Sequence, residues 1–165
     1  MKASIGNTLL TLCILSGSSG VAAAASMSAQ TNDAAAAQSL PEIPGADLIQ
    51  PSDLVKVLKV DDKPLVWQVG SHVLYAEAHI AGAEYIGAGG SPAGQESISQ
   101  RASGLKTDQQ IVIYCGCCPW SRCPNIRAAY QQLHSLGFRN VKALYLPENF
   151  GANWVAKGHP IVRGQ

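Results

Sequence analysis

The sequence lacks several features of proteins that act on nucleic acids or within membranes. Its 165 residues contain no cluster of lysine and arginine, no internal repeat, and no apolar run long and unbroken enough for a convincing membrane-spanning helix. The absence of a polybasic stretch argues against nucleic acid or an anionic membrane surface as a partner. A chain of this length without repeats corresponds to one domain.

The N-terminal 46 residues do not read as part of that domain. Met1 and Lys2 give a short positive start, residues 5–15 are apolar, and the small residues that follow fit a cleavage site near Ala25. We therefore expect a signal peptide over residues 1–25 and an exported protein, periplasmic or secreted, with no membrane span after cleavage. Retention of this segment as an anchor is the alternative.

The rest of the chain divides into a linker and a domain. Residues 26–46 are rich in Ala, Ser, Gln and Pro and have no apolar periodicity, so they read as a flexible linker before a domain over residues 47–165. Charge is uneven along the mature chain, because residues 26–109 carry 10 acidic and 5 basic side chains and residues 110–165 carry 1 and 6. A positive second half suits an anionic substrate.

Apolar segments with strand and helix patterns alternate through the domain. Short β-branched or aromatic runs predict strands over residues 48–50, 65–69, 83–86, 111–114 and 140–146. Helical spacing predicts helices over residues 51–60, 71–78, 95–102, 124–136 and 150–157. This order favours a mainly parallel sheet with helices on both faces, in which ligands bind beyond the carboxyl ends of the strands.

Four of the five cysteines fall together at one such strand end. Cys13 lies in the predicted signal peptide, and the other four are Cys115, Cys117, Cys118 and Cys123. The strand over residues 111–114 delivers Cys115 to a loop, and Pro124 suits the first position of the next helix. The N-terminus of that helix should lower the pKa of a nearby thiol and stabilise an anion.

Other segments make the chain resemble the rhodanese-like sulfurtransferase family. Residues 75–83 are similar to the family's pattern of an aromatic residue followed by x-x-x-H-I-x-G-A, in which we read His79 as a structural residue. Residues 154–160 resemble its closing W-x-x-x-G-x-P element, with Trp154 at a packing position. The resemblance covers residues 48–162 in order, and it implies a three-layer α/β sandwich with a mainly parallel five-stranded sheet.

The chain also departs from the family pattern. Residues 68–70 read Gln-Val-Gly where the family often has Asp-x-Arg, so a charged pair that braces the site is missing. The loop after Cys115 is several residues longer than usual, and it carries four cysteines where the family usually has one.

The resemblance implies sulfur transfer with Cys115 as the nucleophile. Cys115 would take a sulfane sulfur from a small anionic donor, thiosulfate or a persulfide, and pass it to a thiol or another thiophilic acceptor. This chemistry needs no cofactor and no bound metal. The candidate substrate-binding residues lie in the same loop and are Gly116, Trp120, Ser121 and Arg122. Cys117, Cys118 and Cys123 are accessory thiols.

The loop itself leaves three other interpretations open. Cys115 and Cys118 form C-x-x-C at a helix start, which is also typical of thiol-disulfide redox proteins. The four thiols could instead bind zinc or copper(I), which we place below the first two because the segment lacks paired C-x2-C units and contains no histidine. The accessory thiols could also form an inert disulfide that closes the loop.

Overall fold

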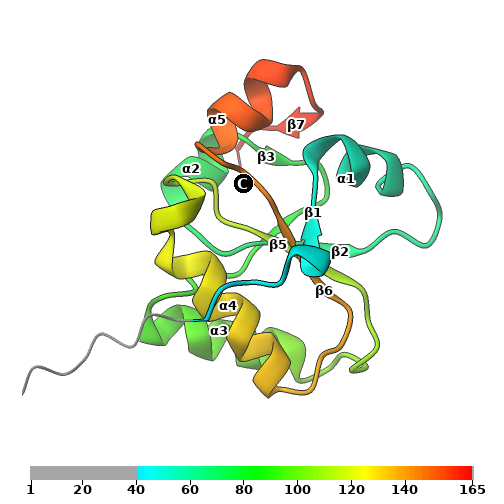
Figure 1. Cartoon of the computed structure of the whole chain (residues 1–165), viewed down its shortest axis with the longest axis vertical. Helices are drawn as coiled ribbons and strands as arrows, with labels where there is room; N and C mark the ends of the chain where they lie inside the picture. The colour runs from blue at the N-terminus through cyan, green and yellow to red at the C-terminus, as the bar shows by residue number, and fades with distance from the viewer. Residues whose placement is uncertain (1–40, 165) are drawn as a thin grey trace, which may run out of the picture. The chain divides into compact units, whose positions relative to one another are not determined.

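A computed structural model describes residues 41–164 of the chain (Figure 1). The predicted signal peptide and residues 26–40 of the predicted linker lie outside the described residues. Across residues 41–164, no helix is both long and apolar enough to cross a membrane. Ile43 is buried in the core, so the packed part of the chain starts before Asp47.

A five-stranded parallel sheet forms the centre of the domain, in the strand order β1-β6-β5-β2-β4. The strands are β1 (Leu48–Ile49), β2 (Leu65–Gln68), β4 (Glu84–Tyr85), β5 (Ile111–Tyr114) and β6 (Val141–Leu144). Every β5 residue is buried, as expected for a central strand covered on both faces. The predicted α/β class and the five strands are confirmed.

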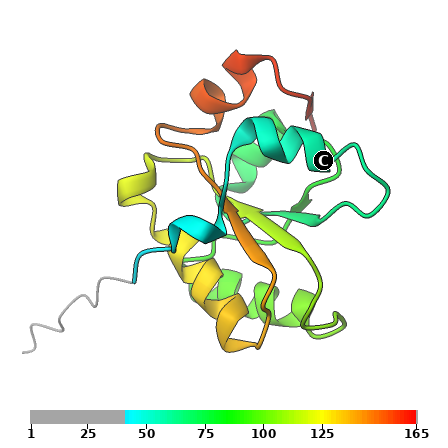
Figure 2. The same cartoon turned by 45° about the vertical axis from the view of Figure 1, so that its right-hand side comes forward.

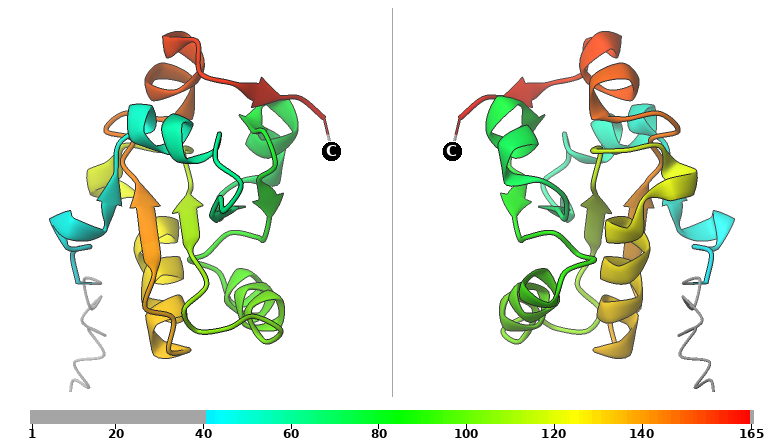
Figure 3. Two further views of the ribbon diagram at one scale, coloured as in Figure 1. Left: turned by 90° about the vertical axis from the view of Figure 1, so that its right-hand side faces the viewer. Right: turned by 90° about the vertical axis from the view of Figure 1, so that its left-hand side faces the viewer.

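Helices cover both faces of this sheet. They are α1 (Pro51–Val57), α2 (His72–Glu77), α3 (Pro92–Ala102), α4 (Pro124–Ser135) and α5 (Phe150–Asn153). Ile98 of α3 and Ile126 of α4 share one core cluster, while Leu54 of α1 and Phe150 of α5 belong to a second cluster on the other face. Figure 3 shows α4 behind β5 and β6 in one view and in front of them in the opposite view.

The side chains of β5, and that of Cys115 directly after it, point alternately to these two faces of the sheet. Ile111, Ile113 and Cys115 belong to the α3 and α4 cluster, whereas Val112 and Tyr114 belong to the other cluster. This alternation follows from the two-residue period of a strand. It turns Cys115 toward the N-terminus of α4.

A second, two-stranded sheet was not predicted. It pairs β3 (His79–Ile80) antiparallel with β7 (Ile161–Val162). The same chain end carries α5 and the short 3-10 helix η3 (Val155–Lys157), where the sequence predicted one continuous helix (Figure 2). Two further 3-10 helices are η1 (Gly45–Asp47) and η2 (Trp120–Arg122).

Candidate functional site: a four-thiol loop

The loop that follows β5, residues 115–123, is called here the thiol loop. Gly116 makes the turn out of the strand with a φ of +74°, and a Cβ atom at Gly116 would lie 2.5 Å from the Cβ of Phe150. The Phe150 N–H donates to the Gly116 carbonyl at 3.0 Å. Glycine is therefore required at this position both for the backbone conformation and for space.

Gln68, the last residue of the neighbouring strand β2, and Gly70 just after it fix the position of Cys115. The Gln68 side chain donates from Nε2 to the Cys115 carbonyl at 3.3 Å and accepts from the Gly70 N–H at 3.1 Å. A Cβ atom at Gly70 would lie 2.8 Å from the Cys115 Sγ. The Gln-Val-Gly segment thus braces Cys115 with neutral groups, at the place where the family pattern often has the charged Asp-x-Arg pair.

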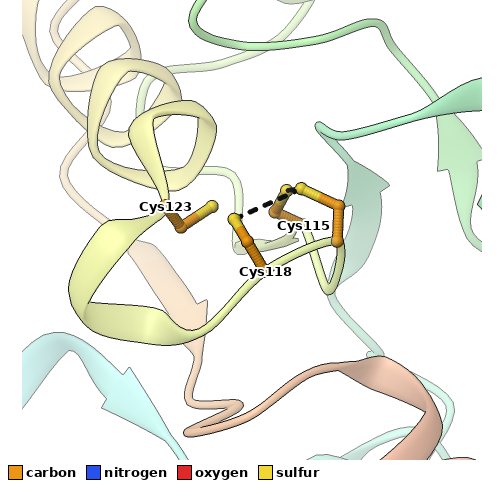
Figure 4. A group of neighbouring side chains, drawn as sticks. Cys115, Cys118 and Cys123 are labelled. Atoms are coloured by element: carbon orange, nitrogen blue, oxygen red, sulfur yellow. Dashed lines mark hydrogen bonds between the residues drawn. The ribbon is translucent and has the colours of Figure 1, made fainter.

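All four thiols of the loop converge. Their Sγ atoms lie within 4.8 Å of one another, and all four cysteines are free thiols. The Cys115 and Cys117 sulfurs are 3.0 Å apart, and those of Cys117 and Cys118 are 3.4 Å apart. Figure 4 shows Cys118 and Cys123 directing their sulfur atoms toward the Cys115 side of the loop. Cys115 and Cys123 are buried, while Cys117 is exposed.

Asn125, in the first turn of α4, also contacts the cluster and was not predicted. Its Nδ2 lies 3.5 Å from the Cys115 Sγ and 3.8 Å from the Cys117 Sγ. Its Oδ1 accepts a hydrogen bond from the Gly90 N–H at 3.0 Å, which orients the amide so that the NH₂ group faces the sulfurs. The only available signal was the position of Asn125 two residues after Cys123, at a helix start.

The negative charge of the cluster is best placed on Cys123, which is the N-cap residue of α4. Hydrogen bonding from the Cys115 thiol, together with the backbone N–H groups of Ile126 and Asn125, lowers the pKa of Cys123 to about 6 despite its burial. A thiolate at a helix N-terminus is stabilised by these donors and by the helix dipole. We expected a thiol near this helix start to have a lowered pKa and Cys115 to be the reacting thiolate, whereas it is Cys123 whose pKa is lowered.

Cys115 and Cys118 are correspondingly held as thiols. The hydrogen bond that Cys115 gives to Cys123, and then its burial, raise the pKa of Cys115 far above the usual range. Burial first, and hydrogen bonding to Cys117 second, raise the pKa of Cys118 to about 12. Among these three cysteines, Cys123 therefore holds the thiolate, with Cys115 and Cys118 as protonated neighbours.

The predicted substrate-binding residues of η2 differ in their exposure to solvent. Trp120 is half-buried, its backbone N–H donates to the Pro147 carbonyl at 3.1 Å, and its ring meets that of Tyr145 edge-on at 5.2 Å. Ser121 and Arg122 are exposed in η2. The ring of Trp120 thus anchors the loop to the body of the domain.

A cavity of about 470 Å³ opens beside the exposed thiol. Gly116, Cys117 and Phe150 line one part of it, and Arg163 lines another. Arg163 is held in place by donating from Nη1 to the Glu77 carbonyl at 3.0 Å. Arg122 does not line this cavity, so Arg163 is a cationic candidate that sequence reasoning missed, because it lies far from the thiols along the chain.

Comparison with known proteins reports on the fold. No protein-family model and no curated protein matches the sequence. Among solved structures, the rhodanese-like domain of the Alr3790 protein from Anabaena sp. matches with a TM-score of 0.54 and 23% identity, over 71% of this chain and 79% of that one. The BH2092 protein from Bacillus halodurans matches with a TM-score of 0.54 and 23% identity, over 70% and 75% of the two chains.

A third structure has a similar TM-score but comes from a longer chain. It is a variant of EanB with a cysteine persulfide, in a tetrahedral intermediate state with ergothioneine, and it matches with a TM-score of 0.53 and 19% identity. The match covers 70% of this chain and 27% of that one, so this chain corresponds to about a quarter of EanB. Together with the strand order and the position of Cys115, these similarities identify the chain as a domain of rhodanese-like fold.

Proposed function

We propose that this domain is a sulfurtransferase that carries a sulfane sulfur on Cys115 as a persulfide. The observation that carries the proposal is the position of Cys115 at the carboxyl end of the central strand β5, beside the N-terminus of α4. Ligands of parallel α/β sheets bind at this edge, and the adjacent helix N-terminus favours anions. The captured persulfide of EanB, a protein that contains a region of similar fold, supports the same chemistry.

The first half-reaction loads the sulfur. The Cys115 thiol gives its proton to the Cys123 thiolate, whose sulfur lies within 4.8 Å of the Cys115 sulfur, and the resulting Cys115 thiolate attacks the outer sulfur of thiosulfate. A new S–S bond forms between Cys115 and that sulfur, the S–S bond of thiosulfate breaks, and sulfite leaves with the bonding electron pair. A persulfide donor would react in the same way and leave as a thiolate.

The second half-reaction unloads it. An acceptor thiolate attacks the outer sulfur of the Cys115 persulfide, and Cys115 departs as a thiolate that recovers its proton. The cavity beside Cys117 offers a place for this acceptor, and Arg163 at its wall offers a positive charge to an anionic donor or acceptor. The partners that we propose are thus a small anionic sulfur donor and a thiophilic acceptor.

Intact-mass measurement after incubation with thiosulfate tests this function. The reduced protein should gain the mass of one sulfur atom, and Cys115→Ser should gain none. Cys117→Ser is the matched control, since it removes a thiol 3.0 Å away and should still load. Loss of two hydrogen atoms without any gain of sulfur would instead indicate thiol-disulfide redox chemistry, and unchanged loading in Cys115→Ser would contradict the assigned nucleophile.

A further inference from the structure

The spacing of the four sulfurs is that of a metal-coordination sphere. A zinc ion binds thiolate sulfur at about 2.3 Å, so the ligands of a tetrahedral site lie about 3.8 Å from one another. In this domain all four Sγ atoms lie within 4.8 Å of one another, with closer pairs at 3.0 and 3.4 Å. Shifts of about 1 Å would bring the set to tetrahedral spacing.

We propose that Cys115, Cys117, Cys118 and Cys123 form a binding site for a single zinc ion, held by four thiolates. This site goes beyond the sulfur-transfer proposal and does not depend on it. The set contains only thiol donors, which favour soft or borderline ions over magnesium or calcium. Four sulfurs around one point favour a tetrahedral ion and leave no open position for a substrate, as in structural zinc sites.

The chain positions these ligands from two rigid sides. Cys115 directly follows β5, Cys117 and Cys118 follow the tight turn at Gly116, and Cys123 approaches from the start of α4. The loop between them is fixed by the hydrogen bond from the Trp120 backbone N–H to the Pro147 carbonyl. A site assembled from a strand end and a helix start is preorganised, which reduces the entropy lost when the ion binds.

The surroundings also suit the charge of such a site. A divalent ion with four thiolates has a net charge of two minus, and metal sites of this kind need outer-shell donors. The Asn125 Nδ2 group reaches the sulfurs of Cys115 and Cys117, and the N-terminus of α4 faces Cys123. Because the Gly90 N–H holds the side-chain oxygen Oδ1 of Asn125, the side-chain NH₂ group already faces the sulfurs before any ion binds.

Binding is an exchange of protons for the ion, with no change of oxidation state. The zinc ion forms four Zn–S bonds, and the protons held by the free thiols are released to solvent. Since Cys115 is one of the ligands, its sulfur cannot carry a persulfide while the ion is bound. Metal binding and sulfur loading therefore exclude each other on a single domain.

Zinc titration of the reduced, metal-free protein against a chromophoric chelator tests the site. We expect one zinc per chain, and cobalt(II) in its place should give the intense thiolate charge-transfer absorption and the visible bands of a tetrahedral site. Asn125→Ala removes an outer-shell partner and should weaken zinc binding roughly 10–100-fold. Cys118→Ser and Cys123→Ser each remove a ligand and should weaken zinc binding by more than that. Ser121→Ala, an exposed neighbour, is the matched control and should bind as the parent does.

Several outcomes would overturn the site. These are equal zinc affinity in Cys118→Ser and the parent, absence of the tetrahedral cobalt spectrum, or saturation by copper(I) alone with no zinc bound. Thermal unfolding of each variant separates loss of a ligand from loss of the fold. Sulfur loading is measured separately on the metal-free protein, where Cys118→Ser should still load, so failure of the zinc site and failure of the sulfurtransferase are distinguished.

Discussion

Two regions carry the residues that resemble the rhodanese-like pattern, and they differ in how their polar atoms are paired. One is the thiol loop. The other is called here the aromatic corner and consists of Tyr75, His79, Tyr85, Trp154 and His159. In the aromatic corner, His79 is buried with its Nδ1 2.8 Å from the Tyr75 carbonyl, and its ring stacks on that of Tyr75 at 3.9 Å. The predicted structural role of His79 is consistent with these contacts.

Two further side chains of the aromatic corner are paired as well. Trp154 is fully buried and donates from Nε1 to the Pro160 carbonyl at 3.0 Å, and the Tyr75 hydroxyl donates to the Ala83 carbonyl at 2.7 Å. In the thiol loop, by contrast, sulfur atoms are paired mainly with one another. Buried polar groups whose hydrogen bonds are satisfied stabilise a fold. Thiols that are hydrogen-bonded mainly to one another remain available for chemistry. Substitutions in the corner should change stability, and substitutions in the loop should change reactivity.

The largest effect should come from Trp154→Ala in the aromatic corner. Removing a fully buried indole leaves a cavity and an unpaired Pro160 carbonyl, which should lower the free energy of unfolding by about 3–5 kcal/mol. Denaturant unfolding measures this loss. At a temperature where the variant stays folded, sulfur loading should proceed at the parent rate, and a specific loss of loading in the folded variant would contradict the division between the two regions.

Gly116→Ala should combine both kinds of effect, because Gly116 belongs to the thiol loop but packs on Phe150. The left-handed backbone and the close approach to Phe150 should together cost roughly 1–3 kcal/mol. The shift of the loop should also slow sulfur loading at Cys115. Gly158→Ala is a control for the backbone term alone, because Gly158 has a similar φ of +72° and no atom within 4 Å of its added Cβ. Equal loading rates in the two variants would show that the turn does not position Cys115.

Gln68→Met tests the neutral brace beneath the thiol loop. The change keeps most of the side-chain volume but leaves the Gly70 N–H and the Cys115 carbonyl without their partner, which should cost about 1–3 kcal/mol. It should also slow sulfur loading, measured as the rate of mass gain. Tyr75→Phe is the control in the aromatic corner, because it removes one hydrogen bond and should cost only about 0.5–1.5 kcal/mol without slowing loading.

The parts of the fold that follow local rules could be predicted from the sequence. The buried run of β5 and the apolar spacing of α4 correspond to elements at the predicted places. The predicted end of α4 is confirmed too, because Gly137 has a φ of +88° and Phe138 is buried after it. Helix α3, however, begins before the predicted start. Ser91 is its N-cap and accepts from the Gly94 N–H, four residues before the predicted start at residue 95.

The parts of the site that depend on distant segments could not be predicted. The pairing of β3 with β7 joins strands far apart in sequence, and each strand is too short for a periodic signal. Likewise, the hydrogen-bond partners of Cys115 come from β2 and from α4, and the Asn125 amide of α4 is itself held by the loop at Gly90. Sequence spacing indicated that four thiols share a loop, but only the packed fold shows which two of them are buried, which is exposed and which one lies at the N-cap position of a helix.

The smallest expected effect concerns the ion pair between Glu84 and Arg101, at the edge of the sheet near the aromatic corner. Arg101 donates to both carboxylate oxygens of Glu84, at 2.7 and 2.8 Å, and this hydrogen bonding lowers the pKa of Glu84 below its ordinary value of 4.5. A lowered pKa stabilises the fold above the unfolded-state pKa, and this contribution is lost as the pH falls through the folded-state pKa. Because both side chains are about 40% exposed, solvent screening limits the contribution to less than about 1 kcal/mol.

Comparison of the parent protein with Glu84→Gln measures this contribution. The free energies of unfolding should differ slightly near neutral pH and converge as the solution is acidified below the ordinary Glu84 pKa of 4.5, and added salt should reduce the difference at neutral pH. A difference that persisted in acid would show that Glu84→Gln acts through packing and not through charge. Sulfur loading should be the same in both proteins, because this ion pair lies outside the thiol loop and makes no contact with its sulfurs.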